Sequence, residues 1–73
     1  MIKAFVVITD MELQILTSVL YTKEVSYYIN VEEVNNVKYY LVYTPDVSSD
    51  EELEDIYKAF IIVRDMPKLI NKM

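Results

Sequence analysis

Apolar residues follow one another almost without interruption at the start of the chain and alternate with polar residues in its middle. Residues 2–8 (IKAFVVI) are mostly β-branched or aromatic, which predicts a strand covered on both faces. Two alternating stretches, 25–31 and 37–44, predict two further strands. The asparagines between them, Asn35 and Asn36, tolerate positive φ and predict a hairpin connection.

The register of this hairpin is predicted from its side chains, because a slip of one residue exchanges the two faces of a strand. Pairing Glu32 with Lys38 separates apolar from polar positions and requires a loop with an odd number of residues, in which Asn36 is left-handed. One face of the hairpin then points to the core: Val25, Tyr27, Ile29, Val31, Val37, Tyr39, Leu41 and Tyr43. The other face consists of Ser26, Tyr28, Asn30, Lys38, Tyr40 and Val42.

Two capping boxes, in which a Ser or Thr is followed three residues later by Glu, predict the starts of two helices. Residues 9–12 (TDME) predict a helix that begins near Asp10, although residues 11–21 also alternate as a strand would. Residues 49–52 (SDEE) predict a second helix, and Pro67 is expected to end it. Helical spacing groups five apolar residues of the first helix on one side: Met11, Ile15, Leu16, Val19 and Leu20.

The last part of the chain leaves one alternative open. Residues 58–66 (KAFIIVRDM) resemble residues 3–11 (KAFVVITDM), and if this similarity reflects a repeat, residues 59–65 form a strand. The amphipathic pattern continues through Val63, which favours the longer helix. Residues 68–72 are expected to form a short final strand. This order predicts an α+β domain of ferredoxin-like type (βαββαβ), with a four-stranded antiparallel sheet and two helices on one face.

The composition restricts the chemistry. The 73 residues suffice for a single domain, residues 1–73, and they include no His, Cys, Gly or Trp. An imidazole base, a thiolate nucleophile, cysteine or histidine metal ligands and a glycine-rich phosphate loop are therefore excluded. We expect a protein that is not an enzyme, with no catalytic residue, metal site or cofactor. The acidic residues Glu51, Glu54 and Asp55 fit a solvated helix start better than an acid-base pair or calcium ligands.

Charge and hydropathy restrict the partners. The net charge of −5 repels phosphate, so direct binding to nucleic acid is not expected. No apolar stretch approaches the roughly 20 residues that span a bilayer, and no secretory signal is visible, so a cytoplasmic location without membrane binding is the default expectation. Tyr28, Tyr40 and Val42 on the more polar face of the hairpin instead predict a surface that another copy covers.

Three parts of the chain together follow the pattern of a known family: residues 1–8, the stretches 25–31 and 39–42, and residues 49–53 before a helix closed by Met-Pro. In these parts the chain resembles the C-terminal ligand-sensing domain of Lrp/AsnC-type transcription regulators, also called the RAM domain. The resemblance implies a stand-alone domain that forms dimers through sheet faces and assembles into larger rings.

In that family the hairpin usually carries a Gly and then an aromatic-Asp pair, which shape an amino-acid site between subunits. Here residues 33–36 (EVNN) hold no Gly, and Tyr40 stands at the Asp position. The resemblance implies that a ligand would be bound at Asn35, Asn36 and Tyr40. We therefore expect a non-enzymatic, oligomeric regulatory or sensor domain that binds a small molecule such as an amino acid between subunits. The alternative is a small protein-interaction module of phage, virus or plasmid type that binds a host protein through its sheet face or acidic helix.

Overall fold

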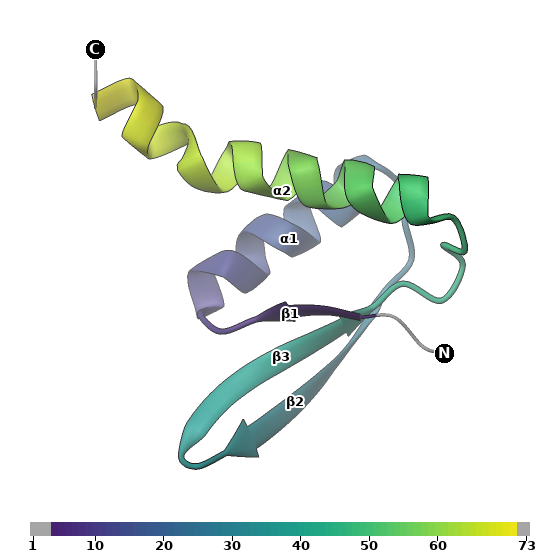
Figure 1. The fold of residues 1–73 in the computed structure, drawn as a ribbon, viewed down its shortest axis with the longest axis vertical. Helices are drawn as coiled ribbons and strands as arrows, with labels where there is room; N and C mark the ends of the chain where they lie inside the picture. Colours follow the sequence, from purple (N-terminus) through teal and green to yellow (C-terminus); the bar gives the residue numbers. More distant parts are fainter. Residues whose placement is uncertain (1–3, 72–73) are drawn as a thin grey trace.

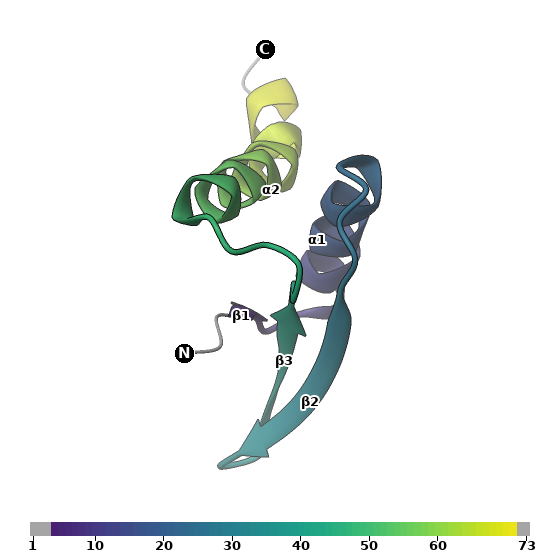
Figure 2. The same ribbon diagram turned by 90° about the vertical axis from the view of Figure 1, so that its right-hand side faces the viewer.

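Two helices and a three-stranded antiparallel sheet make up residues 4–71, the part of the chain that the computed structural model describes (Figure 1). The elements are, in chain order, β1 (Ala4–Val7), α1 (Asp10–Thr22), β2 (Tyr28–Val34), β3 (Val37–Tyr43) and α2 (Asp50–Asn71). The strands are arranged in the order β1-β3-β2, and both helices lie on the same side of the sheet (Figures 1 and 2). The predicted α+β class is therefore confirmed.

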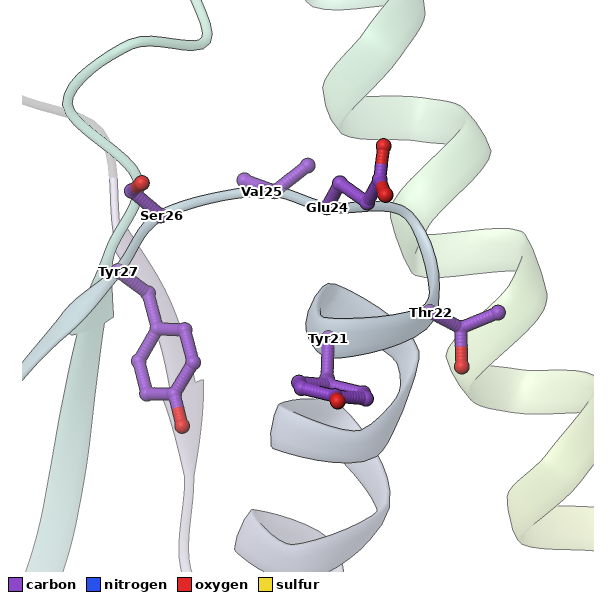
Figure 3. A pocket seen from close by; sticks show the side chains of 6 residues that line it. All are labelled: Tyr21, Thr22, Glu24, Val25, Ser26 and Tyr27. Atoms are coloured by element: carbon purple, nitrogen blue, oxygen red, sulfur yellow. The ribbon is translucent and has the colours of Figure 1, made fainter.

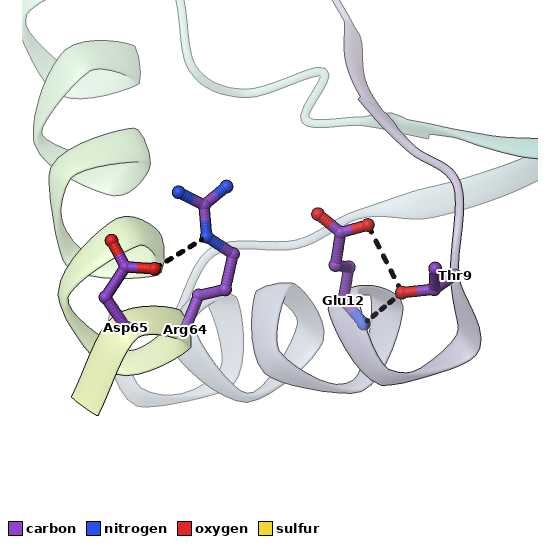
Figure 4. A network of polar contacts seen from close by, with 4 residues as sticks. All are labelled: Thr9, Glu12, Arg64 and Asp65. Carbon is purple, nitrogen blue, oxygen red and sulfur yellow. Dashed lines mark hydrogen bonds and ion pairs between the residues drawn. The ribbon is translucent and has the colours of Figure 1, made fainter. Parts of the chain in front are cut away.

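Both helices begin at the predicted capping boxes. The Thr9 hydroxyl accepts a hydrogen bond of 3.1 Å from the Glu12 N–H, and Thr9 itself is extended (φ −108°, ψ 155°) (Figure 4). At the start of α2, the Ser49 hydroxyl accepts a longer hydrogen bond of 3.4 Å from the Glu52 N–H. Because residues 11–21 lie within α1, the strand interpretation of this stretch is wrong.

A Schellman motif ends α1. The N–H of Val25 donates to the carbonyl of Leu20 at 2.9 Å, and the N–H of Glu24 donates to the carbonyl of Tyr21 at 3.0 Å. Glu24 occupies the left-handed position (φ 58°) that is usually held by glycine, which this chain lacks. The chain then continues to β2, which begins at Tyr28 rather than at Val25 as predicted.

The hairpin closes on a two-residue turn, so the predicted odd-length loop is wrong. Asn35 (φ 53°) and Asn36 (φ 66°) are both left-handed, as a type I′ turn requires, and this confirms the left-handed conformation predicted for Asn36. Lys38 pairs with Glu33, not with Glu32 as predicted. A type I′ turn matches the right-handed twist of the strands, and this local preference decides the register against the separation of apolar from polar side chains.

The core lies between the helices and two of the strands, β1 and β3. Its buried members are Val7, Leu16, Val19, Leu20, Tyr40, Val42, Ile56 and Phe60. Met11 was predicted on the buried side of α1 but is 71% exposed. At 100° per residue it lies roughly 140° around the helix from Leu16, so it points away from the sheet.

The second helix is longer than predicted. Residues 59–65 are helical, so the strand alternative for them is wrong and the longer helix is confirmed. The helix also continues past Pro67 to Asn71, although a proline inside a helix removes one N–H donor and crowds the carbonyl four residues earlier, at a cost of about 3 kcal/mol. The predicted final strand is therefore wrong for residues 68–71, and Lys72 lies outside the described residues. The sheet has three strands in the described range instead of the predicted four.

Candidate interaction surface

The sheet face turned away from the helices, here called the open face, is built from alternate residues of all three strands. The register places Val6 beside Leu41 and Tyr28 beside Tyr43 on this face. Its apolar members are Ala4, Val6, Tyr28, Val34, Val37, Tyr39, Leu41 and Tyr43, and its polar members are Asn30 and Glu32. Among the strand residues that the structure describes, the open face carries a single charge.

Several side chains of the open face are exposed although they are apolar. Val6 is 59% exposed, Val37 is 52% exposed and Tyr28 is 48% exposed. The rings of Tyr28 and Tyr43 stack, with centroids 4.9 Å apart and an angle of 17° between the planes. Stacking restricts both rings before any partner binds, so less side-chain entropy is lost when they are covered.

Six residues were predicted to form one interface, but in the structure they do not lie on the same face of the sheet. These residues are Ser26, Tyr28, Asn30, Lys38, Tyr40 and Val42. The two members in β2 lie on the open face, so their role in an interface stays a prediction. The three members in β3 lie on the helix side, where Val42 is fully buried, so their predicted face is wrong. Ser26 is exposed in the segment before β2.

The two-residue turn is the physical reason for this exchange. It shifts β3 against β2 by one residue relative to the predicted pairing, and a shift of one residue inverts the faces of a strand. As a result Tyr39, Leu41 and Tyr43 reach the open face, although the sequence pattern predicted them in the core. The Asn-Asn pair is the sequence signal that could have revealed them, because both residues suit a type I′ turn.

Tyr40, predicted to line a ligand site, connects β3 to α1 instead. Its hydroxyl donates a hydrogen bond to the carboxylate of Asp10, in the first turn of α1. This hydrogen bond and, to a lesser degree, burial raise the pKa of Tyr40, because the phenol must keep its proton to donate it. The ammonium of Lys38 lies 5.6 Å from the centre of the Tyr40 ring, on the same side of the sheet.

The three residues of the predicted ligand site lie in different parts of the hairpin. Asn35 and Asn36 form the turn at the tip of the hairpin, and their conformation accounts for their presence there. Tyr40 lies three residues beyond the first residue of β3, about 10 Å along the strand. A ligand site at these three residues therefore stays a prediction.

A shallow depression of about 770 Å³ lies where α1 leads into β2 (Figure 3). Its lining residues are Tyr21, Thr22, Glu24, Val25, Ser26 and Tyr27. The rings of Tyr21 and Tyr27 lie on one side of the connecting segment, whereas the carboxylate of Glu24 points to the other side (Figure 3). Polar groups do not converge in this depression, as a specific small-molecule site would require.

The charged side chains of the helices form exposed pairs and caps. Glu54 pairs with Lys58 at 3.4 Å on the surface of α2, and Arg64 donates a hydrogen bond to Asp65 at 3.2 Å (Figure 4). The hydrogen bond to Asp65 raises the pKa of Arg64 further. Within residues 4–71, no group of three or more acidic side chains could hold a metal ion.

Neither helix, as far as residues 4–71 extend, is both long and apolar enough to cross a membrane. No protein-family model, curated protein or solved structure matches the chain. The surfaces of the molecule are therefore the basis on which a function can be argued, and the open face is the candidate with the most exposed aromatic and aliphatic side chains on one continuous face of the sheet.

Proposed function

We propose that the chain is a non-enzymatic regulatory domain that acts as a homo-oligomer, with the open face as a contact between copies. The observation that carries the proposal is the composition of this face, on which eight of ten strand positions are apolar. In an antiparallel sheet the face in contact with water is normally polar and the buried face is apolar, whereas here the open face is mostly apolar. The order β1-β3-β2 with two helices on one side is compatible with a ferredoxin-like fold of which residues 4–71 form three strands.

A second copy suits this face better than a charged partner. The net charge of −5 would make two copies repel each other, but the acidic side chains are concentrated on α2 and the open face holds only Glu32. Four of the apolar side chains on this face, Val6, Tyr28, Val34 and Val37, are each about half exposed, so a second copy that covers the face removes a continuous apolar surface from water. Two identical apolar faces need no complementary charges.

A regulatory role includes the small-molecule ligand that the family resemblance implies. In this proposal the ligand binds where copies meet. Tyr40 lies on the helix side of the sheet, so a contact through the open face does not place it in that site. Amino acids that bind such a site would raise the melting temperature of the assembled protein by mass action, which a thermal-shift panel measures.

The oligomer is tested with Leu41→Lys, which places a charge at the centre of the open face opposite Val6. The matched control is Ile62→Lys, because Ile62 is also an exposed apolar residue (59%) but lies on α2. Light scattering at tens of micromolar protein is expected to show an assembly for the unaltered chain and for Ile62→Lys. It is expected to show a lower mass for Leu41→Lys with unchanged circular dichroism.

Two results contradict the proposal. One is a monomer for the unaltered chain, and the other is a Leu41→Lys variant with the same mass as the unaltered chain. A monomer that forms a stable complex with a different protein, and loses it on Leu41→Lys, would favour the alternative of a protein-interaction module that uses the same face.

A further inference from the structure

The outer edge of β2 is a second unpartnered surface, distinct from the open face. On one side β2 pairs with β3, and on the other side no strand of residues 4–71 lies against it (Figures 1 and 2). All seven residues of β2 are exposed, and none is a proline. Val31 (56% exposed) and Ile29 (37%) lie on the helix side, beside the region that α1 and α2 cover. A strand with exposed apolar side chains on both faces and a free edge is a template for pairing with another strand.

The hairpin turn determines which backbone groups of β2 point outward. A two-residue type I′ loop closes on a hydrogen-bonded pair, here Val34 with Val37, and such pairs then alternate along an antiparallel ladder. The N–H and C=O groups of the intervening residues of β2 are therefore directed to the free edge. These residues are Ile29, Val31 and Glu33.

We propose that β2 pairs with β2 of a second copy, antiparallel, about a two-fold axis that passes beside Val31. This register places Val31 opposite its own copy, Ile29 opposite Glu33, and Tyr28 opposite Val34. Every outward-directed residue meets another outward-directed residue, which gives about six hydrogen bonds between the chains. The pairing uses the whole of β2, because Val31 is its central residue.

The charges of β2 select this register over its neighbours. With the axis beside Val31, Glu32 lies opposite Asn30, which can donate a hydrogen bond to it, and no two carboxylates face each other. With the axis beside Glu32, the two copies of that carboxylate would be directly opposed, which is destabilising. With the axis beside Asn30, Val34 would extend beyond the end of β2 in the other copy. The charge pattern and the strand length thus point to the same occupant, a second β2.

The consequence is a continuous six-stranded sheet. A two-fold axis perpendicular to the sheet keeps the helices of both copies on one side and both open faces on the other. The edge contact therefore does not use the open face and does not depend on the proposed function. If both contacts form, two edge-paired dimers can stack through their doubled open faces, which gives a tetramer with closed symmetry.

A cysteine cross-link tests the edge contact, since the natural chain has no cysteine. In Val31→Cys the two Cα atoms would lie about 5.5 Å apart across the axis, which suits a disulfide. In the matched control Ile29→Cys, on the same side of the sheet, the two positions are offset by four residues, or about 13 Å. Both variants are made in the Leu41→Lys background, which removes the open-face contact, and also in the unaltered chain in case the lysine lowers stability.

With oxidised glutathione as the oxidant, the Val31→Cys chain is expected to form a covalent dimer and the Ile29→Cys chain is expected to remain uncross-linked. Val31→Pro, which removes an outward N–H that β3 does not use, is expected to abolish the dimer of the Leu41→Lys chain in light scattering. Equal cross-linking of both cysteine variants, or of neither, overturns the edge contact. If neither variant cross-links but the unaltered chain is an oligomer that Leu41→Lys dissociates, the open-face proposal stands and the edge proposal fails.

Discussion

The clearest test of the register is a comparison of two identical truncations on opposite faces of β3, Val42→Ala and Val37→Ala. Val42 is fully buried against the helices, whereas Val37 is 52% exposed on the open face. The pairing predicted from the sequence pattern placed them the other way round, with Val37 in the core. The two substitutions remove the same atoms, so the difference in their effects reports which face is buried.

The expected magnitudes follow from burial. Val42→Ala removes two buried methyl groups, about 1.6 kcal/mol of transfer free energy, and leaves a cavity of up to about 50 Å³ that adds roughly 1 kcal/mol. The free energy of unfolding of a 73-residue domain is about 4 to 11 kcal/mol, so a loss of about 2.5 kcal/mol is a large share of it. The melting temperature should fall by about 10 to 20 °C. In the monomeric chain Val37→Ala should cost about 0.5 kcal/mol, because its side chain contacts water there.

Urea unfolding followed by far-UV circular dichroism measures both variants. The dependence of the unfolding free energy on urea should stay the same, so that a shift of the midpoint reports stability alone. Both variants are measured at one protein concentration, low enough that light scattering shows a monomer, and the unfolding free energies are compared with that of the unaltered chain under the same conditions. If Val37→Ala costs as much as Val42→Ala or more, the two-residue register is wrong and the open face is the buried one.

Three other predictions concern local conformation and protonation. Glu24→Gly should stabilise the protein by about 0.5 to 1 kcal/mol, because glycine adopts the left-handed conformation at the end of α1 without a Cβ clash. Thermal unfolding measures the gain, and Glu24→Ala, which keeps the Cβ atom, should show no comparable increase in stability. Asn36→Gly should raise the free energy of unfolding in urea slightly, and Asn36→Ala should lower it by about 1 kcal/mol, because both turn positions have positive φ. The opposite order would contradict the type I′ turn. The hydrogen bond to Asp10 raises the pKa of Tyr40 in the folded state. The stability that this hydrogen bond contributes is therefore complete below the ordinary tyrosine pKa of about 10, and it is lost as the pH rises through the higher pKa of the folded state. Tyr40→Phe should therefore weaken the loss of stability in alkaline solution, and an unchanged pH profile would show that the hydrogen bond to Asp10 is not formed.

Where the sequence signal was local, the prediction held. The capping boxes at Thr9 and Ser49 mark both helix starts, because a side-chain acceptor three residues from its donor forms the same contact in any tertiary context. The left-handed Asn36 belongs to the same class, since its conformation is a property of the turn. Predictions based on element ends were weaker: Pro67 did not stop α2, and β2 begins three residues after the alternation does.

The predicted faces failed because β3 is apolar on both of them. Tyr40 and Val42 alternate with Tyr39, Leu41 and Tyr43, so either set could be buried and the amino-acid pattern does not choose between them. The interface residues predicted in β3 were therefore assigned to the wrong side of the sheet. The same reasoning assigned the predicted residues of β2 to the open face, where the structure also has them.

The sequence by itself determined the α+β class, the two helix starts, the hairpin and the absence of the usual catalytic side chains, since all of these depend on residue identity or on contacts a few residues apart. Only the tertiary structure decided which face of the sheet the helices cover and which face is left open. A turn of two residues fixes the register of β2 against β3 through backbone twist, but the side-chain pattern of β3 suits burial of either face, so the packing of the helices decides which one is covered.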